Sequence, residues 1–263
     1  VSGNLDAAFS VASQTSESDI DADIFHNDTA KINLVDIKNS LSKKFRPEQV
    51  ARFGNIHLIY TSLKRTHFEQ LIAREITRIT KNVKLNFGVE VRVDDSVATL
   101  IYNNGVFPVQ GVRPVFSSII DILETNLSTF LLNALLSNKK VISIVYNTQK
   151  AAIECKMGGQ SVAVPFIGTM DKIRQSNIDD TVANISVHEA GHALVYMLLF
   201  GLAPLQLKSK VASSYAGGFT FSHVVHSTKD NILKKIKVFL AGGIAEELIF
   251  GAEHASVGRA NDR

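Results

Sequence analysis

Residues 188–192, His-Glu-Ala-Gly-His, place two imidazoles four positions apart within a long apolar segment. On an α-helix, residues at this spacing lie on one face, so both rings can reach the same metal ion. Neutral imidazole is a good ligand for Zn²⁺, and two His ligands with one oxygen ligand leave a fourth position for water. Glu189 stands beside the first His, where it can take a proton from that water. The pattern predicts a hydrolytic zinc site with ligands His188 and His192 and the base Glu189; the alternative is a helix whose histidines make ordinary hydrogen bonds.

The segment that carries this pattern is predicted to be a helix. Apolar residues recur through it at helical spacing, and Asp179 or Asp180 can cap its N-terminus. Only Gly191 argues against a helix, because glycine costs about 1 kcal/mol relative to alanine in a helix interior. A glycine at this position would be explained if another element approached the metal-binding helix closely.

The third metal ligand does not follow from the spacing alone. A carboxylate oxygen would complete a site with two His ligands, and the candidate side chains that follow the motif are Glu246, Glu247, Glu253, His254 and Asp262. Glu246 is better suited to orienting a ligand histidine, although both glutamates could also lie on a solvated helix face. His223 and His226, three positions apart, could hold a metal between them or lie on the surface near the cleft.

The composition is that of a globular protein. Of the 263 residues, 45% are hydrophobic and 20% are charged, which suits two modest domains. A net charge of +3 without a dense basic run gives no indication of nucleic-acid binding. The single cysteine, Cys155, excludes an internal disulfide framework, fits a reducing, cytoplasmic compartment, and is predicted to be a small apolar residue on a strand. The most apolar run, 193–205, is too short to span a bilayer.

The first part of the chain predicts alternating helices and strands. Residues 12–28 are rich in Ser, Asp and Thr and are expected to be a solvated loop. A short helix over 31–44, a strand over 55–60 and a long helix with a capping box of Thr66 and Glu69 are expected to follow. The later elements are expected to be a strand over 89–93, a helix from Asp95 or Ser96 to Gly105, a helix with Pro114 in its first turn, strands over 141–146 and 151–157, and a link over 162–177.

The second half, from about residue 181 to 263, resembles the peptidase domain of FtsH-type ATP-dependent zinc metalloproteases. The four motifs in the family's order are His-Glu-Ala-Gly-His-Ala-Leu at 188–194, Ala-Gly-Gly-Phe-Thr at 216–220, Leu-Ala-Gly-Gly-Ile-Ala-Glu-Glu-Leu-Ile-Phe-Gly at 240–251, and Gly-Arg-Ala-Asn-Asp at 258–262. In that family the aspartate of the closing motif is the third zinc ligand, which implies Asp262 here. The resemblance also implies an edge strand, which would hold extended substrate by backbone hydrogen bonds, at Gly217, Gly218, Phe219 and Thr220. A plain glycine bulge is the alternative for this stretch.

The first half, from about residue 45 to 150, resembles the end of a Clp-type AAA+ ATPase module. Phe-Arg-Pro-Glu-Gln-Val-Ala-Arg-Phe at 45–53 is similar to that family's F-x-P-E-x-x-x-R segment, and Gly-Val-Arg-Pro-Val at 111–115 is similar to its Gly-Ala-Arg-Pro-Leu segment. The resemblance implies that Arg52 reaches a neighbouring subunit's nucleotide, that Arg113 contacts nucleotide in its own subunit, and that Asn4 is a polar sensor residue. Both arginines could instead be surface or salt-bridged residues.

Three departures from the Clp-type pattern bear on ATP hydrolysis. Ala51 stands where that family has Asn, Gly54 stands where it has Asp, and the basic residue usual after the second segment is missing. The residues that hold phosphate and Mg²⁺ are missing from the sequence and are expected upstream. The chain begins at Val1 rather than Met, and Arg263 falls within a motif. We therefore expect a piece of a longer protein that cannot hydrolyse ATP with these residues alone.

Together the patterns predict an α+β, multidomain chain. Its parts are the tail of an AAA+ large subdomain (1–52), an AAA+ C-terminal small subdomain (53–160) and a mainly helical, zincin-like metallopeptidase domain (175–263). The implied function is that of an ATP-dependent zinc endopeptidase for protein quality control, a homo-hexamer that unfolds and cleaves polypeptide substrates with Zn²⁺ and ATP/Mg²⁺. The alternatives are a zinc peptidase on a degenerate AAA+ scaffold and a non-enzymatic ring adaptor with structural zinc. A membrane anchor, which FtsH-type proteases carry before their ATPase, is not visible in the chain and would precede Val1.

Overall fold

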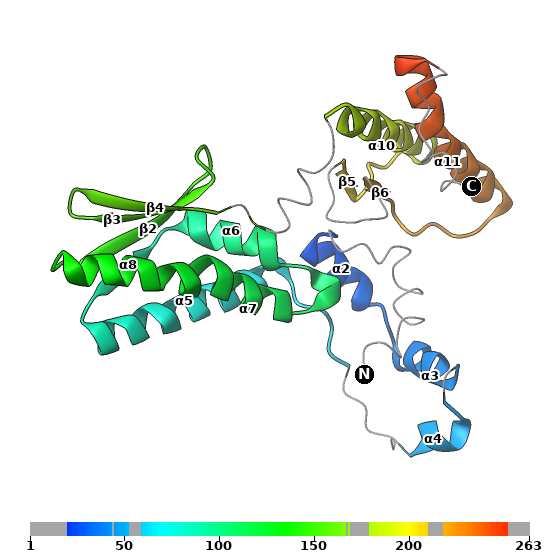
Figure 1. Ribbon diagram of the computed structural model, residues 1–263. Coiled ribbons are helices and arrows are strands. Elements are labelled where there is room, and N and C mark those ends of the chain that lie inside the picture. The colour runs from blue at the N-terminus through cyan, green and yellow to red at the C-terminus, as the bar shows by residue number, and fades with distance from the viewer. Residues whose placement is uncertain are drawn as a thin grey trace. The chain divides into compact units, whose positions relative to one another are not determined.

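The computed structural model describes residues 20–43, 45–52, 59–166, 168, 179–209 and 218–251. The chain divides into two compact units, residues 1–171 and residues 172–263. In Figure 1 the first unit is coloured from blue to green, and the second from yellow-green to red.

The described part of the first unit begins with three short helices, α2 (Ala22–Thr29), α3 (Leu34–Ser42) and α4 (Pro47–Ala51). Helix α2 corrects the expectation of a loop over 12–28 for the described part of that range. Asp21 caps α2 by accepting hydrogen bonds from two backbone N–H groups of its first turn, and Ala22 and Phe25 are buried. The Ser- and Asp-rich composition favoured a loop, so neither the cap at Asp21 nor the burial of Ala22 and Phe25 was predicted.

Helix α5 (Arg65–Phe87) is a long helix of the first unit, and it begins differently from the prediction. Its N-cap is Lys64, whose backbone N–H donates to His67 Nδ1 at 3.3 Å. The capping box of Thr66 and Glu69 is therefore wrong, because Thr66 already lies inside the helix. Glu69 instead accepts a hydrogen bond from Arg65 Nε at 2.9 Å, one turn away on the exposed face. The strand expected over 55–60 lies mostly outside the described residues, and its residues 59 and 60 belong to no strand.

The remaining helices of this unit are α6 (Asp95–Gly105), η2 (Pro108–Gln110), α7 (Arg113–Ile119), the π-helical turn η3 (Ile120–Glu124) and α8 (Thr125–Leu136). Pro114 lies in the first turn of α7, as predicted. The run from Arg113 to Leu136 is the one helix in the described part of the chain that is long and apolar enough, by length and composition, to cross a membrane. Its apolar stripe lies in the core of the unit, and its buried residues include Ile119, Ile122, Leu123, Leu127 and Phe130.

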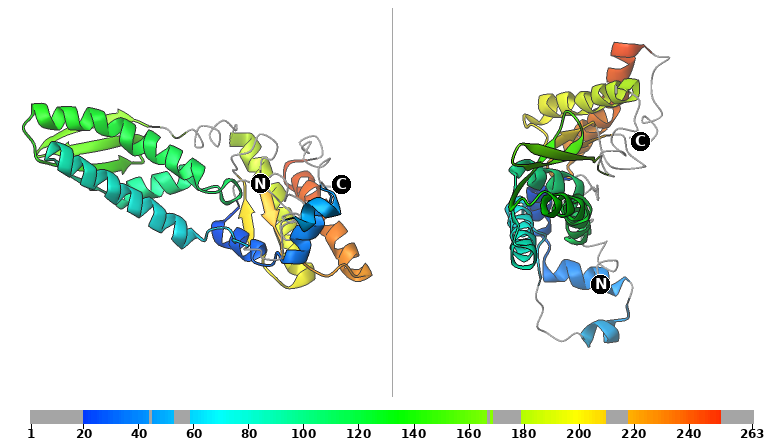
Figure 2. Two further views of the ribbon diagram at one scale, coloured as in Figure 1. Left: turned by 90° about the horizontal axis from the view of Figure 1, so that it is seen from below. Right: turned by 60° about the vertical axis from the view of Figure 1, so that its left-hand side comes forward.

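A four-stranded sheet completes the first unit, with strands in the order β1 (Glu90–Val93), β2 (Val141–Asn147), β3 (Ala152–Met157) and β4 (Gln160–Pro165). β1 and β2 are parallel with Glu90 opposite Val141, whereas β2, β3 and β4 form an antiparallel meander. β4 was not predicted, because its polar start at Gln160 and Ser161 made the stretch resemble a link. Figures 1 and 2 show helices α5 and α8 on one side of this sheet.

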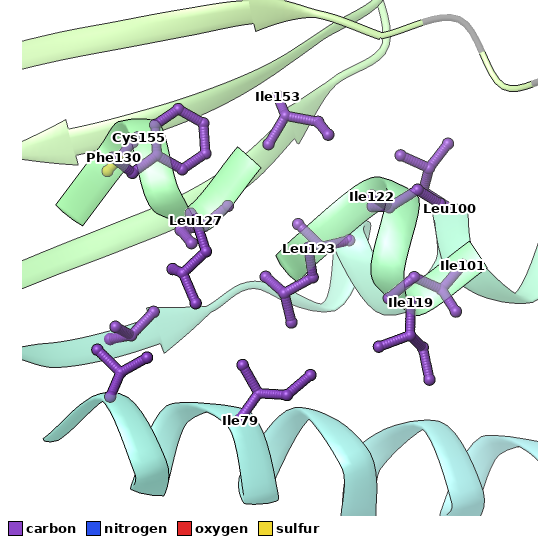
Figure 3. Close-up of a cluster of buried hydrophobic side chains, with 14 of the residues drawn as sticks. Ile79, Leu100, Ile101, Ile119, Ile122, Leu123, Leu127, Phe130, Ile153 and Cys155 are labelled. Carbon is purple, nitrogen blue, oxygen red and sulfur yellow. The ribbon is translucent and has the colours of Figure 1, made fainter. Parts of the chain in front are cut away.

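The hydrophobic core of the first unit lies between the helices and the sheet (Figure 3). Ile153 and Cys155 from β3 face Phe130 and Leu127 from α8 in this cluster, and all four side chains are buried. The prediction that Cys155 is an apolar strand residue is confirmed. Burial raises the pKa of the Cys155 thiol to about 11, because the thiolate would lose its hydration.

The elements described in the second unit are helix α10 (Asp179–Phe200), strands β5 (Gln206–Lys208) and β6 (Phe219–Phe221), and helix α11 (Lys229–Phe250). The two helices pack against each other at Gly191, where an added Cβ would lie 2.7 Å from Ala241 O and 2.7 Å from Ala245 Cβ. The close approach expected at this glycine is thus confirmed. The two strands pair antiparallel, with Leu207 opposite Thr220. With a mixed helix-and-sheet unit followed by a mainly helical one, the α+β class is confirmed.

Candidate metal centre

The two histidines of the 188–192 motif converge on one point, as their spacing on α10 predicted. His188 and His192 are buried, with exposed fractions of 7% and 8%. Their Nε2 atoms are 2.9 Å apart, and the rings meet edge to face with an interplanar angle of 83°. Two imidazole nitrogens therefore share a single small volume beside α11.

The other nitrogen of each ring is held by a partner on α11. His192 Nδ1 lies 2.6 Å from the backbone oxygen of Val238, and because a carbonyl only accepts, this nitrogen must carry the proton. His188 Nδ1 lies 2.8 Å from Oε1 of Glu246, whose side chain is 1% exposed. An ionised Glu246 assigns the proton of this ring to Nδ1 as well. Both Nε2 atoms then present lone pairs to each other.

This arrangement of lone pairs fits a cation. Two nitrogen lone pairs at 2.9 Å repel each other unless a positive charge lies between them. Tetrahedral zinc with Zn–N distances of about 2.0–2.1 Å would hold two imidazole nitrogens about 3.3 Å apart, within a few tenths of an ångström of the separation here. Protonated Nδ1 atoms held by a carboxylate and a carbonyl are also the arrangement that orients metal-bound histidines.

Gly242 on α11 forms the wall of this volume. A Cβ added at Gly242 would lie 2.6 Å from the Nε2 atoms of both His188 and His192. Any side chain here would occupy the space between the two ring nitrogens and the helix. The absence of a side chain therefore keeps open the space that a shared ligand would need.

Glu189 lies next to the histidines and is also buried, with an exposed fraction of 8%. Its Oε2 accepts a hydrogen bond of 2.7 Å from the hydroxyl of Thr220 on β6. The same hydroxyl lies 3.1 Å from the backbone oxygen of Glu189. The carboxylate is therefore held by a strand that comes from outside the helix.

Five of the residues that sequence reasoning connected with the site lie in β6, immediately before it, or on α11. Gly218, Phe219 and Thr220 run along α10, and Glu246 lies against His188. Glu247, which the sequence could not distinguish from Glu246, is partly exposed. Gly217, Glu253, His254, Asp262 and Asn4 lie outside the described residues, so Asp262 as third ligand and Asn4 as sensor stay predictions. Within the described part, no group of three or more His, Cys, Asp or Glu side chains is placed to hold a metal.

Two further candidate histidines, His223 and His226, follow β6 in the second unit. His223 is half-buried beside Tyr196, with 6.4 Å between the ring centroids, and its backbone N–H donates to the Tyr196 hydroxyl at 3.3 Å. His226 is exposed. In the first unit, Arg52 ends helix α4 and Arg113 begins helix α7, and both are exposed. Their contacts with nucleotide stay predictions.

Two family models match the sequence, one in each unit of the chain. Residues 178–263 match the sequence model of peptidase family M41. Residues 63–144 match the model of the C-terminal, D2-small domain of ClpB protein. Both resemblances inferred from the motifs are therefore confirmed, each for its own part of the chain.

Two curated relatives each match about a third of the chain. An ATP-dependent zinc metalloprotease FtsH of Lachnoclostridium phytofermentans is 45% identical over 82 residues, covering 28% of this chain and 14% of that protein. An ATP-dependent zinc metalloprotease YME1 homolog of Schistosoma mansoni is 33% identical over 98 residues, covering 35% of this chain and 15% of that protein. The chain thus matches only about a seventh of the length of these relatives.

Three features of the site were missed by sequence reasoning. The Val238 carbonyl could not be found because any residue supplies one, and the hydroxyl bond of Thr220 depends on how β6 lies against α10. Gly242 did leave a signal, because two successive glycines interrupt an otherwise strong helix pattern at a cost of about 1 kcal/mol each.

Proposed function

We propose that the protein containing this chain is an ATP-dependent zinc metalloendopeptidase that unfolds and hydrolyses polypeptides. The observation that carries the proposal is the pair of buried histidines, whose Nε2 atoms lie 2.9 Å apart while carboxylate and carbonyl groups hold their Nδ1 atoms. A buried carboxylate, Glu189, lies on the same helix immediately beside them. The match to peptidase family M41 and the names of the relatives support zinc as the metal and peptide bonds as the target.

Each residue of the site has a defined task in this proposal. His188 and His192 bind the metal through Nε2, and Asp262 is the proposed third ligand. Zinc, when bound, supplies a Lewis acid that polarises a peptide carbonyl and acidifies a water molecule. Glu189 accepts the proton of the attacking water and passes it to the leaving amine. Glu246 keeps the His188 ring oriented, so that its Nε2 remains a lone-pair donor.

The substrate is proposed to bind as an added strand. β6 pairs with β5 along one edge, and within the described residues this sheet has two strands. An extended polypeptide could pair with the second edge of β6 through backbone hydrogen bonds. Folded proteins do not present extended strands, so a site of this kind requires a partner that unfolds the substrate.

The ClpB-like part is proposed to belong to that unfolding partner. Arg52 and Arg113 are both exposed, which leaves their side chains accessible to nucleotide. A fixed guanidinium stabilises the charge on a transferring phosphoryl group, which is the task proposed for Arg52 across a subunit boundary. We propose a homo-hexameric ring in a reducing compartment, with ATP and Mg²⁺ held mainly by residues beyond this chain.

The decisive experiment measures zinc content and casein cleavage of the full-length protein, with and without ATP. The variant Glu189→Gln should keep its zinc and lose cleavage by about 10²–10⁴-fold, because only the base is removed. Glu247→Gln makes the same charge change on α11 and serves as the control, with unchanged cleavage. Cleavage that survives Glu189→Gln would refute the proposed base.

Two further variants separate the alternatives. Asp262→Ala should lose both zinc and cleavage; retained zinc would mean that another residue is the third ligand. Arg52→Ala should abolish ATP turnover and ATP-stimulated cleavage while leaving zinc in place. Zinc-dependent cleavage that does not respond to ATP would instead favour a peptidase on a degenerate AAA+ scaffold, as the departures at Ala51 and Gly54 suggest.

A further inference from the structure

Thr220 makes a contact that a substrate-binding strand does not require. Its hydroxyl lies 2.7 Å from Oε2 of Glu189 and 3.1 Å from the backbone oxygen of the same residue. A hydroxyl has one proton to donate, and the shorter contact leads to the stronger acceptor, the carboxylate. The side chain of Thr220 is thus committed to Glu189, while strand pairing uses only its backbone.

Gly218 allows β6 to lie this close to α10. A Cβ at Gly218 would lie 2.6 Å from Cγ2 of Ile185, 2.6 Å from the backbone oxygen of Lys208 and 3.1 Å from Cγ of Glu189. No side chain fits at this point without moving the strand or the helix. The strand therefore touches α10 at the same residue whose carboxylate Thr220 holds.

The neighbours of Thr220 fix which way its side chain points. Phe219 and Phe221 are buried, with exposed fractions of 8% and 4%, and side chains alternate from one face of a strand to the other. Thr220 therefore lies on the opposite face from the two rings, and its hydrogen bond to Glu189 shows that this face is turned toward α10. A one-residue slip would move both rings to the other face of the strand and take the Thr220 hydroxyl away from Glu189, so this contact depends on the register of β6.

We propose that Thr220 is a positioning residue for the general base: its hydroxyl holds the Glu189 carboxylate in the orientation needed to meet the attacking water. This assignment rests on the proposed function of the site. It gives the Gly-Gly-Phe-Thr stretch a second task, in which the strand that seats the substrate also orients the base. Strand β6 then sets the position of the Glu189 carboxylate relative to the scissile carbonyl.

The test compares Thr220→Val with Thr220→Ser in the full-length protein. Valine keeps the shape and the β-branch but removes the hydroxyl, whereas serine keeps the hydroxyl. Ser222→Ala removes a hydroxyl two positions along the chain and serves as the control. Zinc content, kcat and KM are measured with ATP on an internally quenched fluorogenic peptide.

The Thr220→Val variant is expected to keep full zinc content and an unchanged KM while kcat falls about ten- to a hundredfold. The Thr220→Ser variant should recover most of that loss, and Ser222→Ala should match the wild type. An unchanged kcat in Thr220→Val would overturn the assignment. So would loss of zinc, a rise in KM alone, or a serine variant as impaired as the valine variant. A wild-type protein that binds no zinc and cleaves nothing would show instead that the proposed function has failed, and this assignment with it.

Discussion

Replacing Gly242 by alanine tests whether α11 forms the wall of a metal cavity. The added Cβ would lie 2.6 Å from both Nε2 atoms, about 0.8 Å closer than ordinary van der Waals contact allows. To relieve this clash, the imidazole rings of His188 and His192 must turn. Turning breaks the hydrogen bonds of their Nδ1 atoms with Glu246 and the Val238 carbonyl. Loss of one such orienting partner typically lowers metal affinity about 10–100-fold, so disturbing both ligands should cost at least about 100-fold.

The magnitude can be read as a change in zinc-dependent stability. A 100-fold loss of affinity removes about 2.7 kcal/mol of stabilisation at a fixed excess of zinc. Alanine is favoured over glycine by about 1 kcal/mol in a helix interior, so the metal-free variant gains helix propensity rather than losing it. We therefore expect the rise in Tm that zinc causes in the wild type to be lost in Gly242→Ala. The Tm of the metal-free protein should change little with the substitution.

The assay uses chelator competition for zinc affinity, and thermal unfolding with and without zinc, on the full-length protein. Ile244→Ala, at a half-exposed position two residues along α11, controls for substitution in this helix. Zinc affinity within about threefold of the wild type in Gly242→Ala would refute the reasoning, because the clash would then not reach the ligands. Equal loss of Tm with and without zinc would show that the substitution disturbs the packing of the helices instead.

Three further outcomes follow from burial and contacts. Glu246→Gln should lower zinc affinity about tenfold, because an amide holds the ligand ring less strongly than a carboxylate; chelator competition should find Glu247→Gln unchanged. The Cys155 thiol, with its pKa raised to about 11, is about 0.1% thiolate at pH 8, against about a quarter for an ordinary thiol. Its alkylation by iodoacetamide, followed by mass spectrometry, should therefore be at least about 200-fold slower than in the unfolded chain, and should rise with pH toward 11. Phe130→Ala should reduce the free energy of unfolding by about 3–5 kcal/mol in urea titrations, whereas Leu136→Ala, at a position 79% exposed, should change it by less than about 0.5 kcal/mol.

The parts of the site that could be predicted are those that one helix determines. His188 and His192 meet because residues four apart share a face of a helix, whatever packs against them. Gly191 indicated a close neighbour, because a glycine in a helix interior destabilises the helix unless another element needs the space. The α+β class followed similarly from periodicities that belong to single elements.

The parts that could not be predicted depend on how two elements are placed against each other. Glu246 and Glu247 are adjacent on α11, and only the rotation of that helix about its axis decides which carboxylate meets His188. The same holds for the hydroxyl of Thr220, whose partner lies on another element. In the first unit, Thr66 failed as a cap because the N-cap is Lys64, two residues earlier, and element ends depend on small energy differences.

The parallel pairing of β1 with β2 has a consequence for the order in which the first unit assembles. β2, β3 and β4 are joined by tight turns, so their pairing closes only short loops and can occur early. β1 meets β2 only after the whole stretch of α6, α7 and α8 has been folded back between them. The entropy of closing that long loop must be overcome before any β1–β2 contact contributes, which slows non-local pairing. The strand that comes first in the chain is therefore expected to be the last to join the sheet.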